Sequence, residues 1–257
     1  MTAATAIHAA PIRLHNQVVL ALAVVAALAI VACGFVSLAP NRLLSGKPVM
    51  LWHAAGPAAA VIGALFLALA ALAFVPARRA VHVTATILAA ILFVAVLYTA
   101  GDAAHRLGVG APKLARISLG AGFWVLLGAA ALAIVDGLQR AGAGPVPRLA
   151  IVLAVAAAAV ALGEAGWFDA LSLAREYHNR HAVFAAAIIR HVALVVGSVA
   201  PAIAIAVPLG ILALRRERWR GPVFATLNLL QTVPSIALFA LLIAPLSALG
   251  LGGIGPV

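Results

Sequence analysis

The chain is divided almost end to end into apolar runs that are each long enough to cross a lipid bilayer. A membrane-spanning helix needs about 20 consecutive apolar residues. The runs are continuous rather than alternating, which favours helices over the strands of a barrel. They predict an all-α fold, a polytopic transmembrane helical bundle of about seven spans. The spans cover roughly residues 17–39, 55–75, 81–100, 117–138, 149–168, 191–214 and 222–247.

Composition leaves almost no room for a water-soluble domain. Of the 257 residues, 66% are hydrophobic and 9% are charged, whereas soluble domains are about 45–50% apolar and about 25% charged. The net charge is +11, but most basic residues lie in short gaps between apolar runs, where they orient spans and contact anionic lipid. No basic stretch is interleaved with aromatic residues, so nucleic acid is not an expected partner. We expect a multi-pass protein of the plasma (inner) membrane.

The basic residues also predict an orientation. Cytoplasmic loops carry an excess of Lys and Arg. The densest basic turn, residues 215–220, separates the last two predicted spans and contains four arginines. Placing this turn in the cytoplasm puts the N-terminus there as well.

The first span contains a run, Ile30–Gly34, that resembles a lipoprotein cleavage box around Cys33. The apolar run continues to Ala39, which is longer than the apolar core of a typical signal peptide. An uncleaved first span is therefore favoured over lipidation. Cys33 is the single cysteine, so no disulfide forms within the chain.

Near residue 165 the sequence changes from apolar runs to a polar connection, and this change predicts the domain organisation. Residues 1–168 are expected to form an N-terminal extension of about five transmembrane helices. Residues 169–190 hold the longest polar connection, and their pattern is typical of an amphipathic helix at the membrane interface. Residues 191–257 contain the last two spans.

The sixth span contains Pro201 and Pro208, which share a helical face with Gly197. A proline removes a backbone hydrogen bond and kinks a helix. Two interpretations remain open: a bent packing helix, or a broken helix that shapes a gate.

The seventh span carries a polar stripe with Pro234 beside it. The polar residues lie at offsets of 0, 3, 4 and 7, on one face of a continuous helix. In lipid such groups face protein or a water-filled path, so the stripe predicts either interhelical hydrogen bonds or the lining of a translocation pathway. The candidate pathway residues are Asn228, Gln231, Thr232 and Ser235, and the candidate gate-shaping residues are Pro201, Pro208 and Pro234.

Other chemistry has little support. Glu176, His178 and His181 lack the spacing of a zinc site, so no metal and no cofactor are expected. Asp136 is a weak candidate for a proton relay near the cytoplasmic end of the fourth span. Neither a Walker A motif nor a Gly-x-Ser-x-Gly motif occurs, so we expect no catalytic residues and no ATPase site.

The last third of the chain resembles the core of type I ABC-transporter permeases, specifically the osmoprotectant (glycine betaine/choline-type) uptake family. Arg190–Ser198 and Val207–Gly210, followed by the basic turn, are similar to the first core helix. The stretch Asn-Leu-Leu-Gln-Thr-Val-Pro-Ser at 228–235 and the Gly-rich stretch Leu249–Pro256 are similar to the next. The preceding spans fit betaine-type permeases that carry extra N-terminal helices.

The resemblance implies partners and a mechanism. The expected partners are an ABC ATPase subunit, an extracytoplasmic substrate-binding protein, and a second permease copy or paralogue. Transport would proceed by alternating access driven by ATP bound on another chain. Family members continue beyond the Gly-rich stretch into an ATPase-docking loop, whereas this sequence stops at Val257. We therefore expect a fragment, a truncated product or a split permease.

Two other function classes remain as alternatives. One is a non-transporting membrane scaffold or sensor derived from a truncated permease. The other is a secondary transporter, which would need an intramembrane acid for ion coupling. Asp136 is the candidate acid for that role.

Overall fold

A computed structural model describes the backbone of residues 13–112 and 114–248. The chain divides into two compact units, Met1–His181 and Ala182–Val257. The first unit holds a bundle of helices and a small sheet, which we call the body. Its elements are α1 (Gln17–Ala32), β1 (Val36–Ala39), β2 (Lys47–Val49), α2 (Leu51–Ala55), α3 (Pro57–Leu72), α4 (Arg79–Gly108), β3 (Arg116–Leu119), α5 (Ala121–Arg140), α6 (Pro145–Glu164) and the start of α7 (Ser172–Arg215).

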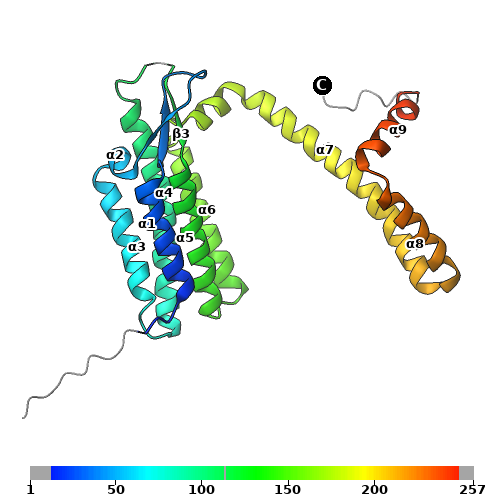
Figure 1. The fold of residues 1–257 in the computed structure, drawn as a ribbon, viewed down its shortest axis with the longest axis horizontal. Coiled ribbons are helices and arrows are strands. Elements are labelled where there is room, and N and C mark those ends of the chain that lie inside the picture. The colour runs from blue at the N-terminus through cyan, green and yellow to red at the C-terminus, as the bar shows by residue number, and fades with distance from the viewer. Residues whose placement is uncertain (1–12, 113, 249–257) are drawn as a thin grey trace, which may run out of the picture. The chain divides into compact units, whose positions relative to one another are not determined.

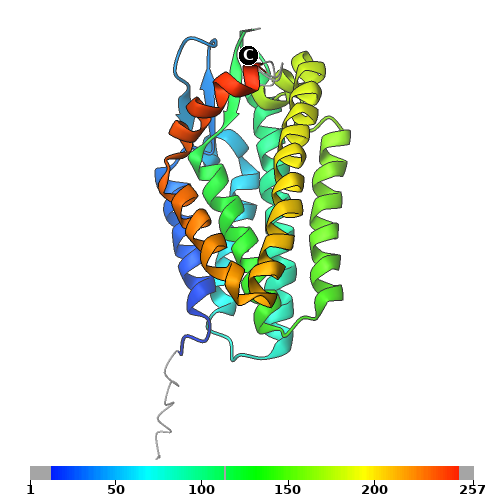
Figure 2. The same cartoon turned by 90° about the vertical axis from the view of Figure 1, so that its right-hand side faces the viewer.

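Helix α4 lies at the centre of the body. It packs against α3, α5 and α6, and α1 packs against α3 and α5. The helices run side by side in both views (Figure 1, Figure 2). Leu92 and Val96 of α4, Ile62 of α3 and Leu126 of α5 are at most 1% exposed. The body is therefore a helical bundle, as predicted, and the structure adds that this bundle has an apolar core of its own.

Helices α4, α5, α6 and α7 are long and apolar enough to cross a membrane, among the residues that the structure describes. Helices α1 and α3 are apolar but have 16 residues each, about 24 Å at 1.5 Å per residue. A bilayer core is about 30 Å thick. The apolar helices confirm a helical membrane bundle, although two of the predicted spans are shorter than expected.

A three-stranded antiparallel sheet, which was not predicted, lies at the end of the bundle where α1 ends and α5 begins. The strand order is β2-β1-β3, with Val36 paired to Val49 on one side and to Leu119 on the other. We call this end of the body the strand end (Figure 1).

The sheet corrects the boundaries of two predicted spans. The runs 17–39 and 117–138 were expected to be helical throughout, but the first ends in β1 and the second begins within β3. A short apolar run fits a strand as well as a helix. Here the choice is made by backbone pairing: the amide of Gly122 donates to the carbonyl of Gly34 at 2.9 Å, and that of Gly120 to Phe35 at 2.9 Å.

The second unit holds the rest of α7, then α8 (Glu217–Thr232) and α9 (Ser235–Ala248). The prediction of one continuous helix over 222–247 is wrong. The backbone leaves the helical region at Val233, where φ is −80° and ψ is 122°. A residue before proline is disfavoured in the α region because of steric conflict with the proline ring. Pro234 therefore ends α8.

Helix α7 also differs from expectation. Its backbone has non-helical values at Arg180, where φ is −132° and ψ is 20°. The predicted connector, residues 169–190, is thus divided by this break rather than forming one amphipathic helix. Pro201 and Pro208 lie inside the helix, and neither has non-helical dihedral angles. Of the two interpretations left open for these prolines, the described backbone shows no break at either one, and the non-helical residue within α7 is Arg180.

Candidate functional site

The predicted polar stripe is only partly on one helix. Asn228, Gln231 and Thr232 lie on α8 and are exposed. The Thr232 hydroxyl donates to the carbonyl oxygen of Leu229 at 2.7 Å. Ser235 lies beyond the break as the first residue of α9, and its side chain lies outside what the structure describes. The expected continuous face of four residues is therefore wrong for Ser235, because α8 ends before it.

The three candidate gate-shaping prolines lie in different settings. Pro201 and Pro208 are exposed within α7, and Pro234 is exposed between α8 and α9. Of the three, Pro234 stands directly beside a change in backbone direction. The resemblance to the permease core also rests on the Gly-rich stretch Leu249–Pro256, which lies outside the described residues.

The helices around these residues present apolar side chains outward. On α7, Val192 is 54% exposed and Val196 58%, and Leu229 on α8 is 68% exposed. In the described part of the second unit, Ala213 is the single buried side chain. These helices therefore offer surface for lipid or protein, and their described side chains do not enclose a path.

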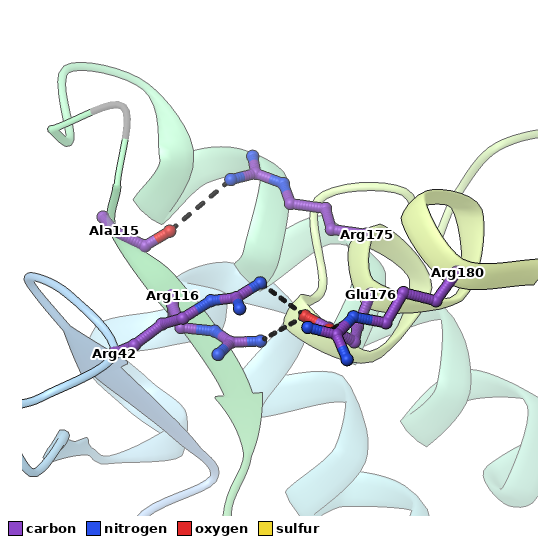
Figure 3. Close-up of polar contacts among 6 residues, drawn as sticks. All are labelled: Arg42, Ala115, Arg116, Arg175, Glu176 and Arg180. Atoms are coloured by element: carbon purple, nitrogen blue, oxygen red, sulfur yellow. Dashed lines mark hydrogen bonds and ion pairs between the residues drawn. The ribbon is translucent and has the colours of Figure 1, made fainter. Parts of the chain in front are cut away.

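The strand end of the body holds a cluster of charged side chains around Glu176 (Figure 3). The Glu176 carboxylate accepts from Arg42 at 2.6 Å and from Arg116 at 3.2 Å, and it pairs with Arg180 at 2.8 Å. Arg42 lies between β1 and β2, Arg116 lies on β3, and Glu176 and Arg180 lie on α7. Arg175 donates to the carbonyl of Ala115 at 3.5 Å. The cluster joins the start of α7 to the sheet.

A cavity of about 470 Å³ lies within this cluster. Seven of its ten lining residues are polar or charged, and three of these seven are arginines. The lining residues are Asn41, Arg42, Leu43, Leu114, Ala115, Arg116, Ser172, Arg175, Glu176 and Asn179.

The sequence did not predict this site. Glu176 was interpreted as part of an exposed amphipathic connector, yet its partners Arg42 and Arg116 are 134 and 60 residues away along the chain. No spacing rule relates residues so far apart. The one available signal was the scarcity of acids, six in the chain, with Glu176 standing among basic residues.

The histidines near Glu176 make local contacts. Nδ1 of His178 lies 2.9 Å from the carbonyl oxygen of Ala174, and Nδ1 of His181 lies 3.2 Å from that of His178. Within the described residues, no group of three or more His, Cys, Asp or Glu side chains is placed to hold a metal ion. Arginines, not histidines, surround the carboxylate.

Asp136, the candidate for a proton relay, belongs to a structural network. Its carboxylate accepts from Asn16 at 2.7 Å and from Nε of Arg140 at 2.9 Å. The Asn16 side chain also accepts from the amide of Val19 and so caps α1. The side chain of Asp136 is 12% exposed. This network ties α1 to α5 at the end of the body opposite the sheet.

A second cavity, of about 630 Å³, lies between α3, α4 and α6. Its lining is almost entirely apolar, with Val61, Ile91 and Val155 among the residues. Such a lining suits a hydrocarbon chain or a helix rather than a charged solute. It adds no polar site to the body.

Comparison with known proteins identifies the body. The family described as "ABC transporter permease YehY, N-terminal domain" matches residues 13–174, well over half of the chain. The chain belongs to this ABC transporter permease family. Its membership agrees with the resemblance seen in the last third, although the matched residues lie before those motifs.

A curated relative supports the same assignment. The chain is similar to the osmoprotectant import permease protein OsmW of Salmonella typhimurium (strain LT2), with 46% identity over 63 residues. The aligned region covers 24% of this chain and 29% of that protein. The chain thus spans about three tenths of this permease relative. No solved structure matches the chain.

Proposed function

We propose that this member of the permease family is the translocation subunit of an ABC importer for quaternary-amine osmoprotectants such as glycine betaine. The family match over residues 13–174 carries the proposal. The apolar helices, four of them long enough to cross a membrane among the described residues, support a multi-pass subunit. The similarity to an osmoprotectant import permease supports the solute class.

The polar residues of α8 supply the proposed pathway. Asn228, Gln231 and Thr232 lie on one face of α8, and the other residues of 227–232 are leucines. Ser235 follows across the break at Pro234. Amide and hydroxyl groups can replace part of the water around a zwitterionic solute while remaining uncharged themselves. Pro201, Pro208 and Pro234 would shape the gate, with Pro234 already at a change of backbone direction.

ATP hydrolysis is assigned to a separate ATPase subunit, and solute capture to an extracytoplasmic binding protein. A second permease copy or paralogue would complete the pathway. Residues 1–168 form the N-terminal extension in this proposal, 169–190 the connector and 191–257 the start of the core. The proposal also has a cytoplasmic N-terminus, which the basic turn at 215–220 supports because cytoplasmic loops carry an excess of Lys and Arg.

Uptake of labelled glycine betaine tests the proposal. Cells that lack their own betaine uptake would express the full-length gene product with its ATPase and binding protein. Replacing Gln231 by Leu removes one hydrogen-bonding side chain from the pathway, and we expect uptake to fall by about five- to tenfold. The matched control is Thr226→Val, a polar-to-apolar change on the other face of α8.

The outcomes separate the parts of the proposal. Normal uptake kinetics in the Gln231→Leu variant would reject the pathway assignment. Absence of betaine uptake by the unaltered transporter would reject the solute class while leaving the family membership intact. A Thr226→Val variant as impaired as Gln231→Leu would show that polarity anywhere on α8 matters, which contradicts a one-sided pathway.

A further inference from the structure

The cavity at the strand end of the body combines three separate segments of the chain. Arg42 comes from the β1–β2 loop, Arg116 from β3, and Arg175 from the first turns of α7. All lie within the first unit. A site whose donors come from three elements is fixed by the fold of the body.

The cavity has an excess of positive charge. Three arginines line it against one carboxylate, that of Glu176, and this carboxylate also pairs with Arg180. A guanidinium has five N–H donors. The described hydrogen bonds use one donor each from Arg42, Arg116 and Arg175. Donors and net positive charge therefore remain for a further anionic group.

A second observation concerns Ser172, which also lines the cavity. Its side chain is buried, with a residue exposure of 7%, and its hydroxyl oxygen has no hydrogen-bond partner in the described structure. A buried hydroxyl without a partner costs free energy, so such groups normally find one. An oxygen-rich ligand in the cavity would supply it.

We propose that this cavity binds a phosphate-type anion, held by Arg42, Arg116 and Arg175 with Ser172 as an additional donor. Arginine pairs with phosphate through parallel N–H donors, which a planar guanidinium presents in a fixed geometry. A volume of about 470 Å³ accommodates a phosphate with a small substituent, since ligand pockets of about 300–1,000 Å³ hold whole small molecules.

Two kinds of molecule could bring a phosphate-type anion to this cavity: a lipid or a soluble phosphate ester. The cavity lies at the end of the apolar helices, where lipid head groups are found in a bilayer, and the phosphate of an anionic head group could pair with the arginines. A soluble phosphate ester would meet the same donors. The inference concerns the body alone and does not depend on the proposed transport role.

Two binding measurements on the purified 257-residue chain test the proposal. In the first, inorganic phosphate and glycerol 3-phosphate are titrated at constant ionic strength, and the thermal unfolding midpoint is followed. In the second, native mass spectrometry counts the phosphatidylglycerol molecules retained by the chain. A saturable rise of the midpoint indicates a soluble anion, and a retained lipid indicates a head group. Either response supports the site if it depends on the arginines.

Arg175→Gln is the principal variant, because Arg175 makes one long bond, to Ala115, and its removal leaves the Glu176 pairs in place. We expect its affinity for the responding probe to fall by about tenfold or more, and Arg175→Lys to recover part of the loss. Arg148→Gln, which removes an exposed arginine at the start of α6, is the matched control and should bind as the unaltered chain does.

The proposal fails if Arg175→Gln and Arg148→Gln behave alike with both probes, or if neither probe binds the unaltered chain. If Arg175→Gln does not fold, Arg42→Gln replaces it. The Arg42 side chain is 57% exposed in a loop, so the body should tolerate its loss. Equal binding by Arg42→Gln and Arg148→Gln would then overturn the site.

Discussion

Helices α4 and α7 have nearly the same hydropathy but very different surroundings. More than a quarter of the most apolar part of α4 is buried, whereas none of the corresponding part of α7 is. Both are rich in Ala, Val, Leu and Ile. Hydropathy therefore predicts that a helix avoids water, but it does not predict how much of the helix is buried within its own compact unit.

The body and the second unit therefore differ in the contacts that stabilise them. The body has an internal core, a capped first helix and a network of long-range polar contacts. The described helices of the second unit present their side chains outward, as expected of helices that pack against lipid or other protein helices. We therefore expect matched substitutions in the two regions to differ in their effect on stability, and unfolding of the purified chain measures that difference.

The largest contrast is expected for leucines. Leu92 on α4 is 0% exposed and Leu229 on α8 is 68% exposed. Leu92→Ala leaves a cavity in the core and should lower the free energy of unfolding by about 2–5 kcal/mol. Leu229→Ala should change it by less than about 0.5 kcal/mol.

Tryptophan fluorescence during unfolding in mixed micelles can report this contrast. Three of the four tryptophans, Trp52, Trp124 and Trp167, belong to the body. A similar loss of stability in both variants would contradict the division, since it would require Leu229 to be packed within the purified chain.

A smaller contrast is expected for two asparagines. Asn16 is 6% exposed, caps α1 and donates to Asp136. Asn16→Ala removes the cap, worth about 0.5–2 kcal/mol, and takes a hydrogen bond from a mostly buried carboxylate, worth about 1.5–3 kcal/mol. Because both contributions come from one side chain, they should not add in full, and we expect a total loss of about 2–4 kcal/mol.

Asn228→Ala on α8 is the matched change, because Asn228 is exposed. We expect the free energy of unfolding to change by less than about 0.5 kcal/mol, although uptake should suffer if Asn228 lines the pathway. An Asn16→Ala variant as stable as the unaltered chain would show that water replaces both hydrogen bonds of the network.

The sequence allowed the membrane fold to be predicted because helical spans follow from local composition. The positions at which helices break were harder to predict, because a proline does not always interrupt a helix. Pro234 ends α8 through its effect on Val233, whereas Pro201 and Pro208 leave the α7 backbone helical. The sheet could not be predicted in this way, because it forms by pairing of Val36 with Val49 and with Leu119. Such pairings join distant segments, and apolar runs of four residues carry no sign of them.

The charged cavity was harder still to foresee. Arg42, Arg116 and Glu176 each look like ordinary loop or interface charges in the sequence. They meet because the sheet carries the first two to the start of α7. By contrast, the polar stripe of α8 was visible in the sequence because its residues are neighbours on one helix, and its part in a pathway remains a prediction for transport measurements.

The smallest contrast is expected for glycines, and it tests helix packing directly. A Cβ atom added to Gly137 on α5 would collide with Oγ1 of Thr86 and approach the carbonyl oxygen of His82 to 3.1 Å, both on α4. Nothing lies within 4 Å of the equivalent position at Gly197 on α7. Gly137→Ala should lower the free energy of unfolding by about 1–3 kcal/mol, because α4 and α5 must separate slightly.

Gly197→Ala is the matched control, and it should leave the stability of the purified chain unchanged or raise it by up to about 1 kcal/mol, since alanine favours a helix over glycine. The same pair can then be compared in the assembled transporter. If Gly197→Ala impairs assembly there but not the stability of the purified chain, α7 meets a close neighbour supplied by another part of the transporter. If Gly137→Ala proves harmless in both, close contact between α4 and α5 at Gly137 contributes little to the body, and the contrast between the two regions would rest on apolar burial alone.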